Sequence, residues 1–318
     1  MGKVAFVFPG QGSQTVGMGQ ELSGHFAEVD NIIKKADERL GFSLSSLMFE
    51  GPQEELTLTY NAQPALLTTS IAILEKLIEA GIKADYVAGH SLGEYSALVA
   101  AGSISFADAV HTVHLRGKFM EEAVPAGEGT MAAVLGLDEA VLLEVTEQVT
   151  STNAPVQLAN LNCPGQIVIS GSRVGVQAAS ELAKEKGAKR VIPLVVSGPF
   201  HSSLMQPAAE KLAAALKTID VKNTEIPVIA NVDAHEMQNA EEINEKLVQQ
   251  LYSPVRWEQS VERMIELGVD TFVEVGPGKV LSGLIKKINR RVTTIPVYDM
   301  ETLQKALDHF QGEDSSNA

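Results

Sequence analysis

Short apolar runs alternate along the chain with longer segments that have the length and composition of helices. The runs at residues 4–8 and 86–88 are typical of buried strands, and residues 64–78 are typical of a helix. A further helix is expected at 203–217, with strands at 228–231 and 271–275. Alternating strands and helices of this kind indicate a parallel α/β sheet.

The middle of the chain has a different order of elements, which begins after the Gly- and Pro-containing segment 125–129. The pattern predicts strand, helix, strand, strand, helix and strand at residues 130–135, 139–149, 156–160, 166–171, 174–186 and 190–195. This βαββαβ order is typical of a ferredoxin-like unit, and the α/β pattern resumes after it. We therefore expect a discontinuous large domain at 1–127 and 197–312, an inserted small domain at 128–196 and a flexible tail at 313–318.

The composition is that of an ordinary globular protein, with 45% hydrophobic and 20% charged residues in a chain of 318. No apolar stretch approaches the roughly 20 residues that a membrane-spanning helix needs. The first apolar run ends at Pro9, too early for a signal peptide, so we expect a cytoplasmic protein that does not enter a membrane. The single cysteine, Cys163, has neither a disulfide partner nor the spacing of a metal site, so we expect a core residue and no bound metal.

The formal net charge of −15 argues against nucleic acid and anionic membrane surfaces as partners, because both require a positive protein surface. An acidic partner would need a local basic patch. The chain has two candidates, either of which could instead be an ordinary solvated face: Lys184, Lys186, Lys189 and Arg190 in one segment, and Lys286, Lys287, Arg290 and Arg291 in another.

The segment 89–93 reads Gly-His-Ser-Leu-Gly and matches the G-x-S-x-G pattern, between the strand at 86–88 and a predicted helix at 94–101. A sharp strand-to-helix turn needs glycines where the backbone crowds, and it lifts the serine hydroxyl clear of the sheet. The backbone N–H of Leu92 then points into the site from the start of the helix. We therefore expect Ser91 to be a covalent nucleophile; the alternative is a structural turn with an inactive serine.

A serine nucleophile needs a base, and one of the seven histidines stands out. His201 follows the loop at 197–200 and precedes a predicted helix, which places it at the same edge of a parallel sheet as Ser91. A helix amino terminus disfavours imidazolium, so His201 should be neutral and able to accept a proton. His90 is expected to pack against or orient its surroundings. The remaining histidines are expected on solvated faces: His25, His111, His114, His235 and His309.

Arg116 flanks the apolar stripe of a predicted helix that spans 106–124. An arginine near an inward face needs an anion, which is either an internal Asp or Glu or the free carboxylate of a substrate. The turn at 9–14 contains Gly10 and Gly12, and a backbone N–H there could complete an oxyanion hole with Leu92. The turn also suits phosphate binding, but the dinucleotide fingerprint fails because Thr15 stands where the third glycine is required.

Taken in order along nearly the whole chain, these segments resemble the malonyl-CoA:acyl-carrier-protein transacylases of bacterial fatty-acid synthesis. The motifs that carry the resemblance are FPGQGSQ at 8–14, QPA at 63–65, GHSLGEYSAL at 89–98, Arg116, NLNCPGQ at 160–166, Phe200-His201, QLYSPVRW at 250–257 and EVGPG at 274–278. The resemblance implies a hydrolase-like α/β large domain with an inserted ferredoxin-like small domain, in agreement with the element order.

The resemblance also implies a role for each site residue. Ser91 would carry the acyl group, His201 would be the base and Arg116 would bind the malonyl carboxylate. The remaining implied roles are an oxyanion hole from Gln11 and Leu92, a backbone carbonyl of Gln250 that orients His201 in place of an acidic third residue, and a pocket narrowed by Phe200 that favours malonyl over methylmalonyl.

The implied reaction moves the malonyl group from malonyl-CoA to the phosphopantetheine thiol of acyl carrier protein, through a malonyl-serine and with ping-pong kinetics. This transfer would supply fatty-acid elongation. Coenzyme A enters as the thioester substrate, and no bound cofactor is expected. The acidic carrier would dock on Lys189 and Arg190 or on Lys286 and Lys287. We expect a monomer. The alternatives are the same chemistry acting on a polyketide synthase in trans, a serine thioesterase or hydrolase, and a non-catalytic module that binds carrier protein.

Overall fold

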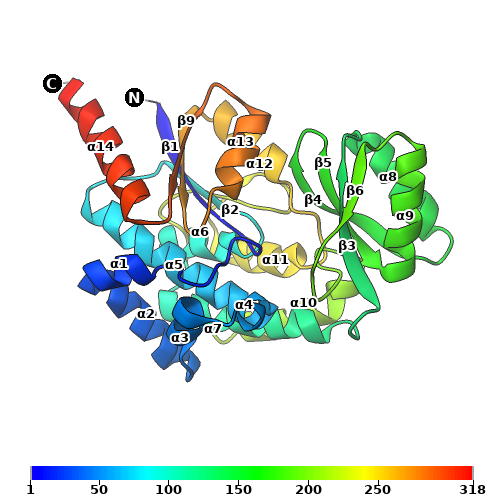
Figure 1. The fold of residues 1–318 in the computed structure, drawn as a ribbon, viewed down its shortest axis with the longest axis horizontal. Helices are drawn as coiled ribbons and strands as arrows, with labels where there is room; N and C mark the ends of the chain where they lie inside the picture. Colours follow the sequence, from blue (N-terminus) through cyan, green and yellow to red (C-terminus); the bar gives the residue numbers. More distant parts are fainter. Residues whose placement is uncertain (1, 317–318) are drawn as a thin grey trace.

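Two separate β-sheets organise the chain in the computed structural model, which describes residues 2–316 (Figure 1). The larger sheet has six strands in the order β10-β9-β1-β2-β7-β8. All neighbours are parallel except β7 and β8, which are antiparallel. The strands are β1 (Lys3–Phe8), β2 (Tyr86–Gly89), β7 (Val228–Ile229), β8 (Glu236–Met237), β9 (Val269–Val275) and β10 (Thr293–Val297). The prediction of a parallel α/β sheet is confirmed.

Strand β1 lies between β9 and β2, and helices cover both faces of the sheet there. Val4, Phe6 and Phe8 pack into one apolar cluster, whereas Ala5 and Val7 pack into another. Because both faces are buried, the strand is an unbroken apolar run rather than an alternating one. The first cluster includes residues of α5 (Thr59–Glu79), α6 (Gly93–Ala100) and α7 (Phe106–Glu122), and the second includes residues of α12 (Trp257–Glu266) and α13 (Val280–Ile288).

The remaining helices of the larger unit surround this sheet. None of the described helices is long and apolar enough to cross a membrane. They are α1 (Gln20–His25), α2 (Ala27–Leu40), α3 (Leu44–Glu50), α4 (Gln53–Thr57), the 3₁₀ turn η1 (Ser203–Met205), α10 (Gln206–Leu216), α11 (Ala240–Gln250) and α14 (Met300–Ser316). Residues 313–316 therefore continue a helix where the sequence predicted a tail, and residues 317–318 lie outside the described part of the chain.

The smaller sheet is antiparallel, with the strand order β4-β5-β3-β6, and forms a separate lobe in Figure 1. Its elements run β3 (Gly129–Leu135), α8 (Glu139–Thr150), β4 (Val156–Cys163), β5 (Gln166–Ser172), α9 (Arg173–Glu185) and β6 (Arg190–Pro193). This is the predicted ferredoxin-like βαββαβ order. Strand β4 is longer and β6 shorter than predicted. One face packs on α8 and α9, while Met131, Ala159 and Val168 join the main apolar cluster.

Helix α5 corrects two expectations at once. It begins at Thr59, so Pro64 lies inside the helix rather than at its start. Pro64 has no N–H to donate to the carbonyl of Tyr60, four residues earlier. The Nδ1 of His114 on α7 donates to that carbonyl at 2.7 Å, and His114 is buried instead of solvated. The two helices come this close because α7 has Gly117 at the crossing, where an added Cβ would lie 2.5 Å from the Cα of Tyr60.

The bond between His114 and Tyr60 should therefore replace the hydrogen bond that Pro64 removes. His114→Phe keeps a ring in place but leaves the Tyr60 carbonyl without its donor, so we expect the free energy of unfolding to fall by about 1–3 kcal/mol. Pro64→Ala in the His114→Phe background restores a backbone donor and should recover part of the loss. Urea denaturation measures the free energy of unfolding of both variants. A double variant no more stable than His114→Phe would contradict the idea that the His114 bond replaces the one that Pro64 removes.

Candidate active site

A sharp turn joins β2 to α6 and holds Ser91 in the left-handed region, with φ of 50°. The backbone is crowded on both sides of the serine. A Cβ added to Gly89 would lie 1.8 Å from the carbonyl carbon of Gly93, and one added to Gly93 would lie 2.1 Å from the carbonyl oxygen of Phe8. Only glycine fits these two positions, as the G-x-S-x-G pattern predicted.

Asn231, two residues after the end of β7, holds this strained turn. Its Oδ1 accepts a hydrogen bond from the backbone N–H of Ser91 at 2.7 Å, and its Nδ2 donates to the carbonyl of Gly89 at 2.7 Å. Its own backbone N–H donates to the buried carboxyl of Glu94 at 2.8 Å. Neither Asn231 nor Glu94 was predicted from the sequence as a site residue; the only local signal for Asn231 was a polar residue at the end of a predicted strand.

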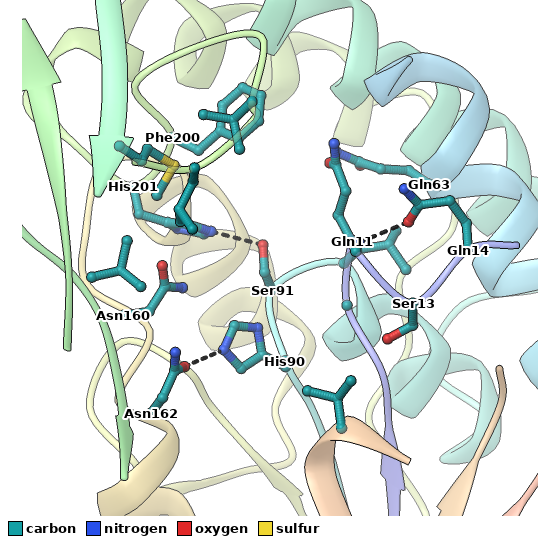
Figure 2. Close-up of a pocket in the computed structure, with 18 of the residues that line it drawn as sticks. Gln11, Ser13, Gln14, Gln63, His90, Ser91, Asn160, Asn162, Phe200 and His201 are labelled. Carbon is teal, nitrogen blue, oxygen red and sulfur yellow. Dashed lines mark hydrogen bonds between the residues drawn. The ribbon is translucent and has the colours of Figure 1, made fainter. Parts of the chain in front are cut away.

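Ser91 and His201 lie in hydrogen-bonding contact, with 2.7 Å between Oγ and Nε2 (Figure 2). The Nδ1 of His201 donates to the backbone carbonyl of Gln250 at 2.9 Å, the contact that the family resemblance implied. This bond leaves Nε2 unprotonated, so the serine hydroxyl is the donor. Burial and then the positive charge of Arg116 lower the pKa of His201 to about 3, so the imidazole is neutral.

Arg116 is buried on α7, and its guanidinium reaches the serine. Nη2 donates to Ser91 Oγ at 3.1 Å and to Gln250 Oε1 at 2.8 Å, and Nη1 donates to Gln63 Oε1 at 2.8 Å. Over residues 2–316 no carboxylate forms an ion pair with this arginine, so the internal-anion alternative is not realised. Burial lowers the pKa of Arg116, and the nearby Tyr95 and Glu94 oppose that shift.

Gln250 connects these groups through both its backbone and its side chain. Its Oε1 faces Arg116, and its Nε2 donates to the carbonyl of Ser91 at 3.0 Å and to Oε2 of Glu94 at 3.2 Å. Glu94 is the acid in this network, and burial raises its pKa to about 7. It does not touch His201, so no acidic residue takes the third position of a triad.

Two backbone N–H groups are available beside the serine. Gln11 and Leu92 line the same cavity as Ser91, and among the described residues neither backbone N–H has an acceptor. The side chain of Gln11 is engaged elsewhere, since Nε2 donates to Thr59 Oγ1 at 3.2 Å. Gly10 lets this loop approach the serine turn, because an added Cβ would lie 2.5 Å from the carbonyl oxygen of His90. This pair can stabilise an oxyanion.

The cavity at Ser91 has a volume of about 260 Å³ and is lined by both units of the protein. Phe200, beside His201, is buried in its wall, and Asn160 and Asn162 reach it from β4 (Figure 2). His90 links the two units, because its Nε2 lies 2.9 Å from Asn162 Oδ1. This contact agrees with the expectation that His90 orients its surroundings.

The two predicted basic patches lie on different units of the protein, one on α13 and the other beside β6. Lys287 on α13 donates to Gln166 Oε1 at 3.1 Å, and Gln166 lines the cavity. Lys286 donates to the carbonyl of Val292 instead. Lys189 and Arg190, at the start of β6, are exposed. Within residues 2–316, no group of three or more His, Cys, Asp or Glu side chains is arranged to hold a metal ion.

Comparison with known proteins agrees with this geometry. Residues 5–312 match the acyl transferase domain family. The malonyl CoA-acyl carrier protein transacylase of Bacillus subtilis is 62% identical over 318 residues, covering 100% of both chains. Among solved structures, the transacylase of that name from Clostridium perfringens superposes with a TM-score of 0.96 at 44% identity, covering 99% of both chains.

A third similar protein is a malonyl-transacylase solved in complex with its type II PKS acyl-carrier protein, which superposes with a TM-score of 0.94. It is 46% identical and covers 96% of this chain and 99% of its own. Sequence identity at this level over nearly the full length, together with the match to the family model, establishes the family of the chain. The chain is an acyltransferase that belongs to the acyl transferase family and, within it, to the malonyl CoA-acyl carrier protein transacylases.

Proposed function

We propose that this enzyme transfers a malonyl group from malonyl-CoA to the phosphopantetheine thiol of acyl carrier protein through a malonyl-serine at Ser91. The observation that carries the proposal is the convergence of two groups, the imidazole of His201 and the guanidinium of Arg116, on the hydroxyl oxygen of Ser91. Ser91 Oγ lies 2.7 Å from Nε2 of His201 and 3.1 Å from Nη2 of Arg116. The names of the relatives, one of them solved with a carrier protein, support both substrates.

In the first step, Ser91 Oγ attacks the thioester carbonyl carbon and His201 Nε2 takes the hydroxyl proton. The Gln250 carbonyl holds Nδ1–H, so Nε2 has the free lone pair. The backbone N–H groups of Gln11 and Leu92 stabilise the oxyanion. When the intermediate collapses, the C–S bond breaks, and the coenzyme A sulfur takes the proton from Nε2.

In the second step, the carrier's pantetheine thiol gives its proton to Nε2 of His201, and its sulfur attacks the malonyl-serine ester. The C–O bond breaks and Ser91 Oγ takes the proton back. One thioester replaces another, so the equilibrium constant of the overall reaction is near one. The kinetics are ping-pong because the malonyl-serine forms before the carrier thiol reacts. The serine ester must persist between the steps, and the small cavity limits access of water.

Two residues favour a malonyl group in particular. The Arg116 guanidinium has donors that can turn to the malonyl carboxylate, and its present acceptors are neutral oxygens. The buried ring of Phe200 narrows the wall and disfavours a branched acyl group. One methyl group is worth only about 1–3 kcal/mol, so discrimination against methylmalonyl should be modest.

The alternatives have less support. A non-catalytic module has no need of a serine and a histidine at 2.7 Å, and a general thioesterase has no need of the unpaired charge of Arg116. Service to a polyketide synthase uses the same residues and remains the alternative pathway, since one relative is bound to a type II PKS carrier. The cytoplasmic location, the monomeric state, the domain boundaries and the absence of a bound cofactor stay predictions from the sequence.

Intact-mass analysis tests the acyl-serine directly. The parent protein mixed with malonyl-CoA should gain one malonyl group, and Ser91→Ala should gain none. Arg116→Ala removes the cation that favours a carboxylate, so it should lose the preference for malonyl-CoA over acetyl-CoA by on the order of 100-fold. A parent protein without an adduct would refute the proposal, and an Arg116→Ala variant that still preferred malonyl would refute the role of Arg116.

The pH dependence tests the state of His201. The base works when neutral, so activity is lost as the pH falls through its pKa, which burial and Arg116 hold at about 3. The rate of Ser91 labelling by a neutral fluorophosphonate should therefore be flat from pH 8 to about pH 5. Arg116→Met removes one cause of the lowered pKa and should move the acid limb to higher pH. A tenfold loss per pH unit beginning near pH 6.5 in the parent would contradict this prediction.

Charge reversal tests the docking surface, which we propose is formed by Lys189 and Arg190 or by Lys286 and Lys287. Replacing these four residues with Glu should raise the KM for carrier protein by on the order of tenfold at low salt. Acylation by a small malonyl thioester without phosphates should not change. Lys34→Glu with Lys35→Glu on α2 reverses two charges and is the matched control for each pair reversed separately. An unchanged KM with both patches reversed would exclude this surface.

A further inference from the structure

Both terminal nitrogens of Arg116 donate to the amide oxygen of a buried glutamine. Nη1 lies 2.8 Å from Oε1 of Gln63, and Nη2 lies 2.8 Å from Oε1 of Gln250. Gln63 is 1% exposed, and Arg116 and Gln250 are fully buried. Because guanidinium has donors only, the amide atom that faces it must be oxygen. Both glutamines therefore orient the arginine without neutralising it.

A buried guanidinium with neutral partners is an expensive arrangement. Removing a charge from water is strongly unfavourable, and an adjacent carboxylate is the usual compensation. The acid nearest along the hydrogen-bond network, Glu94, acts on Arg116 through its charge, but it forms no direct hydrogen bond with the guanidinium, because the amide of Gln250 bridges the two. Glutamate has the same shape as glutamine, so a single isosteric change at either position would supply the missing anion.

The two glutamines differ in what their NH₂ groups do. In Gln250, Nε2 donates to the carbonyl of Ser91 and to Glu94, so a carboxylate there would lose both bonds and repel Glu94. Among the described residues, the one hydrogen-bond acceptor of Gln63 Nε2 is the sulfur of Met120, at 3.4 Å, which is a weak acceptor. A glutamate at position 63 would lose little hydrogen bonding. The distinctive property of Gln63 is therefore its lack of charge.

Gln63 also lies where its lack of charge can affect the bound acyl group. It lines the cavity and reaches toward it from α5 (Figure 2). Gln63 directly precedes Pro64, in the helical turn where His114 donates the hydrogen bond that Pro64 cannot. The backbone of Gln63 is therefore held by α7, the helix that also carries Arg116. The position of its amide oxygen relative to Nη1 is thus set by the packing of two helices.

We propose that Gln63 is a specificity-determining residue, which orients Arg116 through a neutral oxygen and so keeps the guanidinium charge available for an acyl group that ends in a carboxylate. This inference rests on the proposed function. A malonyl carboxylate would complete the charge pair that the protein itself leaves open. An acetyl group would leave the cation buried and unpaired.

The test compares acylation by malonyl-CoA and acetyl-CoA, which share the same coenzyme A, in the parent and in Gln63→Glu. The new carboxylate would pair with Arg116, so kcat/KM for malonyl-CoA should fall while that for acetyl-CoA rises. We expect the malonyl-to-acetyl ratio to fall by on the order of 100-fold. A purely structural role would lower both rates by the same factor and leave the ratio unchanged, which would overturn the inference.

Gln63→Met is the matched control, because it is similar in size and neutral but lacks the oxygen. It should lower both rates and retain most of the malonyl preference. If Gln63→Met lost the malonyl preference as fully as Gln63→Glu, the shape of the side chain rather than its charge would set the preference, and the inference would be wrong. The same conclusion would follow if Gln63→Met lost the preference and Gln63→Glu failed to fold. A parent protein that malonyl-CoA does not acylate would refute the proposed function instead, so the two failures are distinguishable.

Discussion

The buried positive charge of Arg116 is the constraint on which the site depends. It lies 3.1 Å from the serine oxygen, it helps to lower the pKa of His201, and no carboxylate among residues 2–316 pairs with it. One cation therefore acts on both members of the Ser91–His201 pair and also provides an anchor for an anionic acyl group. A desolvated charge interacts strongly in this way because little water is present to screen it.

A second constraint is backbone strain at the two reacting residues. Ser91 and His201 both have positive φ, at 50° and 58°, in a region that side chains with a Cβ rarely occupy. Such conformations persist only where the surroundings hold them. Asn231 holds the N–H of Ser91, and the Gln250 amide holds its carbonyl. The serine is thus supported by the segment after β7 and by the end of α11, both far from it in sequence.

Much of the architecture could be predicted because it depends on local patterns. The unbroken apolar run of β1, the strand order of the inserted unit and the glycines around Ser91 are short-range features with direct physical causes. His201 could be proposed from its loop, because the ends of parallel strands meet at one edge of a sheet. The residues alone left both anions open for Arg116. The family resemblance implied the malonyl carboxylate for Arg116, and it added Gln250, whose carbonyl lies 2.9 Å from His201.

The sequence by itself determined the two-sheet fold, the serine turn and the identity of the histidine beside it. Only the tertiary structure decided that Arg116 faces Gln63 and Gln250 rather than an acid, and that Asn231 ties Glu94 to the serine turn. It also placed His114 against Tyr60, where the sequence predicted a solvated histidine. The physical reason is that a turn depends on neighbouring residues, whereas each of these hydrogen bonds depends on how separate helices and strands pack.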